Sequence, residues 1–281
     1  MQEELPRRAF ITSTAIGIAA IAGCTQSDSE GTNSDNSAPA DDNETTTSEE
    51  PSVPEDANIT LSVPTAADLD GLQSPLMAFF DAENFTVEPA GEPTDGAGHF
   101  HVMVDTSQVE PGETIPNDDQ HLHFGDGAEH TVLDLEPGEH ELTLQMGDGE
   151  HTALPLVDTQ TVTVEERAAV SLDAPQDGDV VSTDETITFK PVVDNFVIEQ
   201  AGELTQNAGH HHLLVNTDPV STGTVIPSDD QHIHFGNGTE MPEIDASELG
   251  AGEYELIIQI ANGVHEAYPL TTDPITITIE E

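Results

Sequence analysis

Histidines recur at fixed places in two copies of one sequence pattern. Thirteen histidines occur among the 281 residues, and the segments "GHFH" and "DDQHLHFGDG" return as "GHHH" and "DDQHIHFGNG" 111 residues later. Many hydrophobic positions differ between the copies, whereas ten histidines fall in five matched pairs, which makes these imidazoles the candidates for chemistry. The pairs are His99 with His210, His101 with His212, His121 with His232, His123 with His234, and His151 with His265.

The spacing of these histidines predicts that they converge. Residues i and i+2 of a strand point to the same face, so each H-x-H segment presents two imidazoles on one face. The connection "SQVEPGETIPNDD" is typical of a broad link between neighbouring antiparallel strands. Strands about 4.8 Å apart would then bring four imidazoles together. We expect Leu122 and Phe124 to face the core and the histidines to face a cleft or solvent, with His151 arriving from the turn before it.

Clustered imidazoles indicate a transition-metal site in each repeat. Without a cysteine or a suitably spaced methionine nearby, Cu(II) or Zn is favoured over Cu(I). Because metals bind deprotonated imidazole, affinity is expected to fall as the pH drops through about 6.5. Carboxylates and amides beside the second H-x-H are candidates for orienting the ring N–H groups. These residues are Asp118, Asp119 and Gln120 in the first copy and Asp229, Asp230 and Gln231 in the second.

Two other functions compete with metal binding. In a structural or adhesive surface protein, the histidines would be hydrogen-bonded braces of a sheet edge. A metal-dependent hydrolase or redox enzyme would need an open coordination position and a base, for which Asp119 and Asp230 are the candidates. The sequence contains no G-x-S-x-G elbow, phosphate-binding glycine loop or dinucleotide fingerprint. We therefore expect no enzymatic activity.

The elements that must position the histidines are short strands. Each copy contains alternating or β-branched runs, such as "ITLSV" and "ELTLQM", separated by Gly, Pro, Asn and Asp turns. This pattern predicts an all-β protein with two tandem Ig-like antiparallel β-sandwich domains, at residues 58–166 and 167–281. Residues 66–82, "AADLDGLQSPLMAFFDA", are ambiguous and are compatible with a helical turn.

The net charge of the chain restricts the salt conditions in which the protein is stable and the molecules that it can bind. The chain has 56 Asp and Glu against four Lys and Arg, for a formal net charge of -52. The negative charges repel one another. This repulsion is tolerable in concentrated salt, because the Debye length falls to about 3 Å at roughly 1 M. The composition is typical of an extreme halophile. Nucleic acid is excluded as a partner because it requires a basic patch, and cations are the expected ligands.

The N-terminus predicts export and lipid anchoring. Residues 1–23 join the arginine pair Arg7 and Arg8 to an apolar run too short to span a bilayer, which is typical of a twin-arginine signal peptide. The "IAGC" that ends at Cys24 resembles a lipobox and implies lipid attachment to this cysteine, the only one in the chain. Residues 24–57 are expected to form a disordered acidic, Ser/Thr-rich tether. The protein is therefore predicted on the extracellular face of the cytoplasmic membrane, which it touches only through this lipid.

The repeated segments also resemble a known family. "GHFHVMVDT", "IPNDDQHLHFGDG" and "GEHELTLQMGDGEH", with their counterparts in the second copy, are similar to exported domains catalogued as domain of unknown function 4399, here in a haloarchaeal-type twin-arginine lipoprotein. The resemblance implies an exported, β-rich, His-bearing unit without an established activity. A weaker similarity to copper-zinc superoxide dismutase rests on an H-x-H strand in a β-sandwich. The chain lacks the disulfide and the full ligand set of that family, so dismutase activity is not expected.

Overall fold

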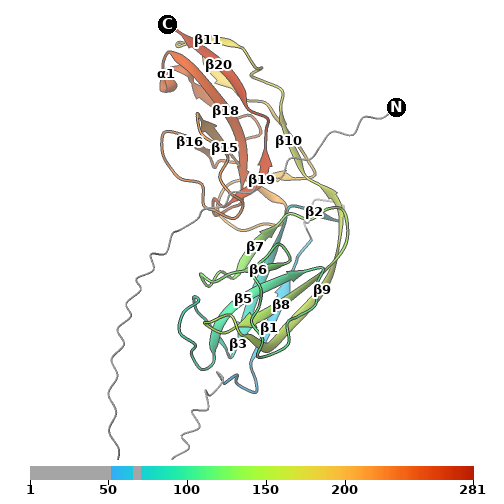
Figure 1. Ribbon diagram of the computed structural model, residues 1–281. Coiled ribbons are helices and arrows are strands. Elements are labelled where there is room, and N and C mark those ends of the chain that lie inside the picture. Colours follow the sequence, from blue (N-terminus) through green and yellow to red (C-terminus); the bar gives the residue numbers. More distant parts are fainter. Residues whose placement is uncertain (1–51, 66–70) are drawn as a thin grey trace, which may run out of the picture. The chain divides into compact units, whose positions relative to one another are not determined.

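The computed structural model describes residues 52–65 and 71–281. The predicted signal peptide, Cys24 and most of the predicted tether lie outside the described residues. The described chain is almost entirely β-structure, with one helix of a single turn, α1 (Ala246–Leu249). Its strands form two successive β-sandwich repeats, as the sequence predicts (Figure 1).

Repeat 1 contains two sheets. One has the strand order β1-β3-β7, and the other has the order β2-β9-β8-β5-β4, with β6 also pairing with β5. The strands are β1 (Asn58–Ser62), β2 (Leu72–Ser74), β3 (Leu76–Glu83), β4 (Thr86–Val87), β5 (Ala97–Val104), β6 (His121–His123), β7 (His130–Leu133), β8 (Gly138–Gly147) and β9 (Ala153–Arg167).

Repeat 2 follows the same plan, except that the counterparts of β3 and β9 are each divided into two shorter strands. Its larger sheet has the order β11-β20-β18-β15-β14, with β16 on β15 and β19 on β18, and two pairs, β10-β13 and β12-β17, make the opposite layer. The strands are β10 (Ala169–Leu172), β11 (Val180–Ser182), β12 (Thr186–Thr188), β13 (Pro191–Asp194), β14 (Val197–Ile198), β15 (Ala208–Val215), β16 (His232–Phe235), β17 (Glu243–Asp245), β18 (Gly252–Ala261), β19 (Ala267–Thr271) and β20 (Ile275–Glu280).

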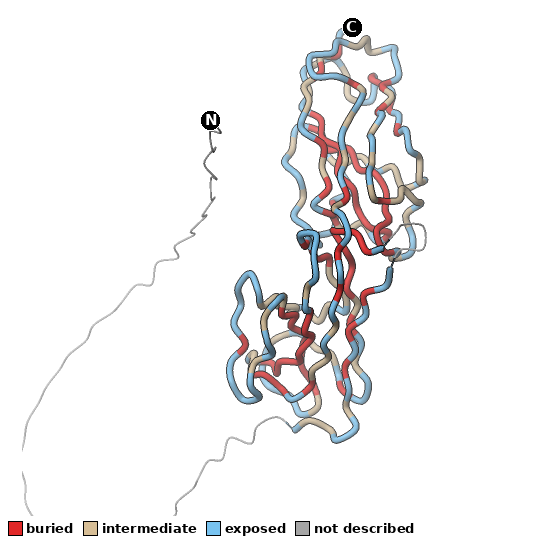
Figure 2. Tube along the Cα trace, turned by 90° about the vertical axis from the view of Figure 1, so that its right-hand side faces the viewer, coloured by how far each residue is buried: buried red, intermediate tan, exposed pale blue. Residues whose placement is uncertain are grey.

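Alternation along the strands places apolar side chains in the core of each sandwich. In β1, Ile59 and Leu61 are buried between exposed neighbours. In β5, Phe100 and Val102 join the main core of repeat 1, and Leu122 and Phe124 pack against it, which confirms that the even positions face inward. Figure 2 shows the buried residues along the central strands of both repeats.

The structure differs from the sequence prediction at the sheet edges and in the ambiguous segment. Most strand pairs are antiparallel, but four short edge pairs are parallel: β2 with β9, β4 with β5, β11 with β20 and β14 with β15. The described part of the ambiguous segment forms β2 and β3 rather than a helical turn. The side chains of β3 are mostly buried, and its long pairings with β1 and β7 override any local helical preference.

The outer face of β5 is covered rather than exposed. The connection between β5 and β6 folds back over it, and Met103 packs there with Ile115 and Ala153 in a small second core. The N–H of Ile115 donates to the carbonyl oxygen of His151 at 2.8 Å, which fastens the connection to the loop after β8. The odd-numbered side chains of β5 therefore lie in a buried layer, not in an open cleft or in solvent.

The two repeats form one compact unit. Two buried amides of repeat 2 bond the backbone of repeat 1. The Oε1 atom of Gln206 accepts from the N–H of Met77 at 2.7 Å, and Nδ2 of Asn207 donates to the carbonyl oxygens of Gln73 and Pro75, both at 2.8 Å. Met77 also packs into the core of repeat 2.

Candidate metal centres

Strand pairing brings three imidazoles of repeat 1 together. Strand β6 lies antiparallel to β5 with His101 directly opposite His123, and His99 lies two residues earlier on the same face of β5. The ring centroid of His123 is 5.0 Å from that of His99 and 5.1 Å from that of His101. The Nε2 atoms of His99 and His101 are 3.1 Å apart. All three rings therefore point their outer nitrogens at one volume.

The loop after β8 supplies a fourth imidazole. Asp148 fixes this loop, because its Oδ1 accepts from the N–H groups of Glu150 at 2.9 Å and Thr152 at 2.8 Å. His151 has a φ of 69°, in the left-handed region that few side chains adopt. Its Nε2 lies 3.1 Å from Nε2 of His123. The loop thus accepts an unfavourable backbone conformation and delivers an imidazole to the group.

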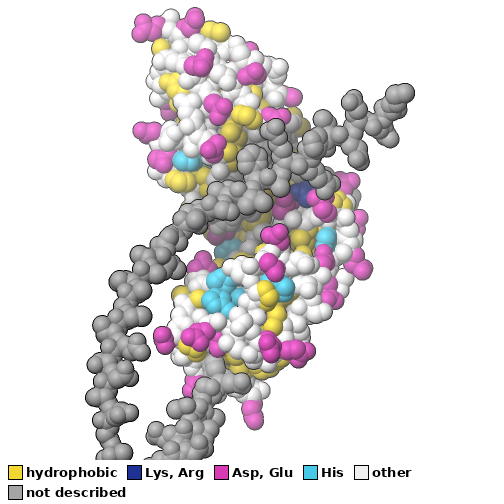
Figure 3. Space-filling model, in the orientation of Figure 1, with side chains coloured by type: hydrophobic (Ala, Val, Ile, Leu, Met, Phe, Trp, Pro, Cys, Tyr) yellow, Lys and Arg dark blue, Asp and Glu magenta, His cyan; other side chains and the backbone are white. Residues whose placement is uncertain are grey.

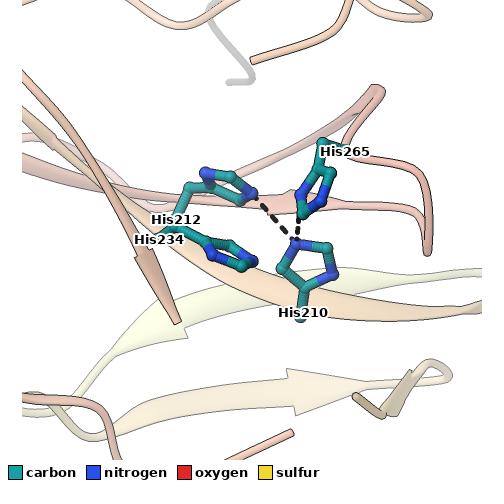
Figure 4. Close-up of side chains that lie close together, drawn as sticks. All are labelled: His210, His212, His234 and His265. Atoms are coloured by element: carbon teal, nitrogen blue, oxygen red, sulfur yellow. Dashed lines mark hydrogen bonds between the residues drawn. The ribbon is translucent and has the colours of Figure 1, made fainter. Parts of the chain in front are cut away.

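Repeat 2 builds the same arrangement more tightly. Figure 4 shows the rings of His210, His212, His234 and His265 converging; the first two lie on β15, His234 lies on β16, and His265 lies on the loop after β18. Nε2 of His210 lies 3.0 Å from Nε2 of His212 and 3.2 Å from Nδ1 of His265. The ligand atoms of all four residues lie within 4.8 Å of one another, whereas in repeat 1 this holds for the three strand histidines. His265 also has a positive φ, 72°.

Glycines in the two motifs make room for the imidazoles, a role that the sequence analysis missed. A Cβ on Gly125 would lie 2.2 Å from Cε1 of His123, and one on Gly236 would lie equally close to Cε1 of His234. The last residue of H-x-H-F-G must therefore lack a side chain. The glycines that open the two G-H-x-H segments, Gly98 and Gly209, are also required. A Cβ on Gly98 would lie 2.2 Å, and one on Gly209 2.1 Å, from a backbone oxygen of the neighbouring strand.

A buried glutamine beside each group was also missed. Gln145 is completely buried; its Oε1 accepts from the N–H of Val109 at 2.9 Å and its Nε2 donates to the carbonyl oxygen of Val109 at 2.8 Å. Gln259 makes the same pair of bonds with Val220. Each glutamine ties the long connection to the strand beneath it. Their presence at matched positions in both repeats was the signal available in the sequence.

Burial keeps the strand imidazoles neutral. Burial and the neighbouring imidazoles lower the pKa of His99 to about 4 and that of His101 to about 3. The same causes lower the pKa of His210 and of His212 to about 3. The second H-x-H strand lies nearer the surface, and in Figure 3 histidine side chains are visible at the surface of repeat 1 among carboxylates. The buried strand imidazoles are therefore uncharged at neutral pH, and His123 and His234 form the more exposed side of each group.

In both groups, imidazole nitrogens lie within hydrogen-bond distance of other imidazole nitrogens rather than of oxygen atoms. In a neutral pair such as His99 and His101, one ring holds its proton on Nε2 and the other on Nδ1. The Nδ1 atoms of both rings are buried without a partner, as are those of His210 and His212. Each such pair leaves one donor and one acceptor unsatisfied, at a cost of about 1–3 kcal/mol per group.

The five histidines outside the groups behave differently, since each bonds an oxygen. Nδ1 of His121 lies 2.8 Å from Oδ1 of Asp118, and Nδ1 of His140 lies 2.8 Å from Oδ2 of Asp105. The remaining bonds are His130 to Glu266 at 2.9 Å, His211 to the carbonyl oxygen of Thr239 at 3.1 Å, and His232 to Oδ1 of Asp229 at 2.7 Å. The chain thus contains two classes of histidine.

Two predicted ligands, His121 and His232, lie outside the groups. Because β6 runs antiparallel to β5, His121 is opposite Met103 rather than His101 or His99. His232 is likewise opposite Leu214, two residues beyond His212. Both histidines lie on the predicted face of their strand, but the pairing register with β5 or β15 places them too far along the strand to join the group.

The predicted outer-shell residues serve the loop instead of the grouped rings. Asp118 accepts from the N–H of Gln120 at 3.0 Å as well as from His121, and Nε2 of Gln120 donates to the carbonyl oxygen of Val104. In repeat 2, Asp229 and Gln231 make the matching bonds. Asp119 and Asp230 are exposed. The carboxylates shape the turn before β6 and β16.

Several solved structures match the chain at low sequence identity and low TM-score. The fibronectin(III)-like modules of Clostridium thermocellum CbhA are 12% identical, over 79% of this chain and 92% of that one, with a TM-score of 0.26. The chicken CNTN1 FN1-FN3 domains are 10% identical, over 83% and 70% of the two chains, with a TM-score of 0.28. SGBP-B of Bacteroides ovatus is 12% identical, over 79% and 47%, with a TM-score of 0.18. Likeness at this level carries no information on function.

A sequence match to a protein family is more informative than these structural similarities. No curated protein matches the sequence, and no helix in residues 52–65 or 71–281 is long and apolar enough to cross a membrane. The family described as Domain of unknown function (DUF4399) matches residues 78–166 and 187–280, once in each repeat. Both matches contain the G-H-x-H and H-x-H-F-G strands that build the imidazole groups. The chain therefore belongs to the DUF4399 family and carries two tandem copies of its domain.

Proposed function

We propose that each four-imidazole group binds one transition-metal ion, Zn²⁺ or Cu²⁺, so that the chain holds two. The observation that carries the proposal is the division of the histidines into two classes. Five bond oxygen acceptors, as structural histidines do, while the other eight turn their nitrogens toward one another in two groups. A metal ion at the centre of each group would be bound by these nitrogens once the ring proton now shared between two of them has moved to the other nitrogen of its ring.

The chemistry of the ligands supports these two metals. Four neutral nitrogens without sulfur suit Zn²⁺ and Cu²⁺. With Zn–N bonds of about 2.0–2.1 Å, the nitrogens of a tetrahedral site lie about 3.3–3.4 Å apart. The nitrogen–nitrogen contacts of 3.0–3.2 Å are close to this edge length. The other nitrogen pairs of repeat 2 lie within 4.8 Å, and the rings must close these distances to complete a tetrahedral site.

Four imidazoles also favour a binding role over catalysis. Catalytic zinc sites keep one position open for water or substrate, whereas structural and storage sites are closed by protein ligands. With His151 or His265 as the fourth ligand, a tetrahedral site here is complete. The exposed Asp119 and Asp230, the only base candidates from the sequence, lie on the turn before the second H-x-H strand.

The lowered pKa values change the expected pH dependence of metal binding. Protons compete with a metal for imidazole only near and below the pKa of the folded protein. Since the pKa of His101 and of His212 is about 3, these two ligands should remain unprotonated well below pH 6.5. This revises the expectation drawn from the ordinary pKa of histidine.

The setting that we propose is the outer surface of the cell membrane. Lipid on Cys24 would anchor the protein, and residues 24–57 would hold the repeats away from the bilayer. A net charge of -52 raises the local concentration of cations. Two sites on such an anchor suit a scavenger or carrier of copper or zinc.

The test combines elemental analysis with matched variants. Protein made without a His tag should contain two equivalents of Zn or Cu, or take up two in calorimetry. His234→Ala should remove one equivalent and leave the second, because it deletes a ligand. The control His232→Ala changes the neighbouring H-x-H histidine, which lies outside the group, and should retain both equivalents. If the wild type binds no metal stoichiometrically and the two variants differ only in melting temperature, the histidines are braces and the proposal fails.

A further inference from the structure

Repeat 2 contains a pocket that the metal groups do not use. It has a volume of about 270 Å³ and is lined by Pro191, Val193, Phe196, Ile198, His211 and Glu240. His211 lies between two residues of the imidazole group, His210 and His212, on β15. Because side chains alternate along a strand, His211 points to the opposite face of the sheet. The pocket and the metal group are therefore separated by β15 itself.

Repeat 1 fills the corresponding space with aromatic rings. Phe80 pairs with Leu61 in β1 just as Pro191 pairs with Leu172 in β10, and Phe100 occupies the position of His211. The ring of Phe80 lies 5.4 Å from that of Phe100 and 5.1 Å from that of Phe124. In repeat 2 a proline and an imidazole replace the first two rings. These smaller side chains leave the pocket between the layers.

The same proline opens the wall of the pocket. In repeat 1 the N–H of Phe80 donates to the carbonyl oxygen of Glu129 at 2.8 Å. Pro191 has no N–H to give to Glu240, the counterpart of Glu129. Strand β3 accordingly runs unbroken, whereas its equivalent in repeat 2 is divided into β12 and β13. Two sequence changes, to Pro191 and His211, thus remove the aromatic rings that fill this space in repeat 1. Pro191 also removes the hydrogen bond that closes its wall.

The polar groups of the pocket are hydrogen-bond acceptors. Nδ1 of His211 lies 3.1 Å from the carbonyl oxygen of Thr239, which only accepts, so the ring proton sits on Nδ1. Nε2 then carries a lone pair, and this buried atom has no partner. The carboxylate of Glu240 is exposed beside it. A ligand must therefore bring donors, and a positive charge is favoured over a negative one.

We propose that this pocket binds a small organic amine, with its N–H groups toward His211 and Glu240 and its apolar part against Val193, Phe196 and Ile198. The volume is just below the range of about 300–1,000 Å³ that holds drug-sized ligands, so the amine is small. The proposal is independent of metal binding, because the pocket lies on the other face of the sheet. In repeat 1 the rings of Phe80 and Phe100 occupy the equivalent space, so we expect no amine site there.

The test is a titration of the ¹⁵N-labelled chain with benzylamine, followed by two-dimensional NMR in about 1 M KCl, where non-specific attraction of cations is screened. We expect saturable shifts around β13 and β15 of repeat 2, with a dissociation constant on the order of 1 mM for so small a ligand. Benzyl alcohol, which donates without charge, should bind more weakly, and benzoate should not bind. His211→Phe and, separately, Pro191→Phe should weaken benzylamine at least about tenfold, since each restores a ring present in repeat 1.

Metal content serves as the control in these experiments. Both variants should keep the metal stoichiometry of the wild type, which separates failure of this proposal from failure of the metal sites. Three results would overturn the proposal: no saturable shifts with benzylamine, undiminished binding to a folded His211→Phe or Pro191→Phe protein, or equal shifts with benzyltrimethylammonium, which carries charge without an N–H donor.

Discussion

The glycine of the H-x-H-F-G motif provides a sharp test of the proposed metal site, because its replacement displaces a proposed ligand without removing it. In Gly236→Ala the new Cβ would lie 2.2 Å from both Cε1 and Nε2 of His234, whereas ordinary van der Waals contact begins at 3.4 Å. The ring must therefore retreat by about 1.2 Å. Metal–ligand distances tolerate only about 0.2 Å, so His234 would no longer reach the ion.

The expected result is a weakened second site in an intact fold. Loss of an outer-shell partner costs roughly 10–100-fold in metal affinity, and displacement of a ligand should cost at least as much. The metal-free protein should keep its stability to within about 1 kcal/mol, because His234 is exposed and can turn into solvent. Calorimetric titration with Zn²⁺, and melting curves with and without Zn²⁺, measure the two quantities.

A matched control is available in the same chain. The nearest atom to a Cβ on Gly91 is 4.0 Å away, and its φ is not in the left-handed region, so Gly91→Ala should leave both sites unchanged. If Gly236→Ala binds two ions with wild-type affinity, His234 does not bind metal through the ring position seen here. If it unfolds while Gly91→Ala does not, the glycine serves the fold and not the site.

Three further predictions concern pH, salt and anchoring. Burial lowers the folded-state pKa of His101 and His212 to about 3, so the unfolded chain binds protons first as the pH falls below 6.5. Metal-free protein should lose stability from pH 6.5 downward, by up to about 1.36 kcal/mol per ring and pH unit; urea midpoints that stay constant from pH 7 to 5 would contradict this. Transfer from about 1 M to about 0.01 M salt removes the screening of the net charge of -52 and should sharply lower the melting temperature, which a salt-independent melting curve would refute. Cys24→Ser should release the protein into the medium, and retention of the variant in salt-washed membranes would show that the lipid is not the anchor.

The prediction of the imidazole groups succeeded where it depended on local geometry. Alternation places His99 and His101 on one face of β5 and Phe100 on the other, whichever strand lies beside them. The same rule placed Leu122 and Phe124 against the core. The retention of ten histidines in two copies included all eight grouped residues, together with His121 and His232, which lie outside the groups. The repeat itself, the all-β class and the sharing of faces follow from sequence because each depends on neighbours in the chain.

Other features depend on contacts between distant segments, and these the sequence left open. Strand register selects His123 over His121, since both lie on the same face of β6 and only the pairing with β5 decides which one meets His101. The connection between β5 and β6 buries the histidine face through packing at Ile115, which a strand pattern does not reveal.

Side-chain alternation is thus a property of the backbone of one strand and is written in the sequence. Convergence of ligands, burial with its lowering of imidazole pKa, and the pocket opened by Pro191 and His211 are relations between segments far apart in the chain. Their energies come from packing and hydrogen bonds that exist only when the sheets close. The sequence by itself determined which residues offer imidazole nitrogens on one strand face, and the tertiary structure decided which of them meet.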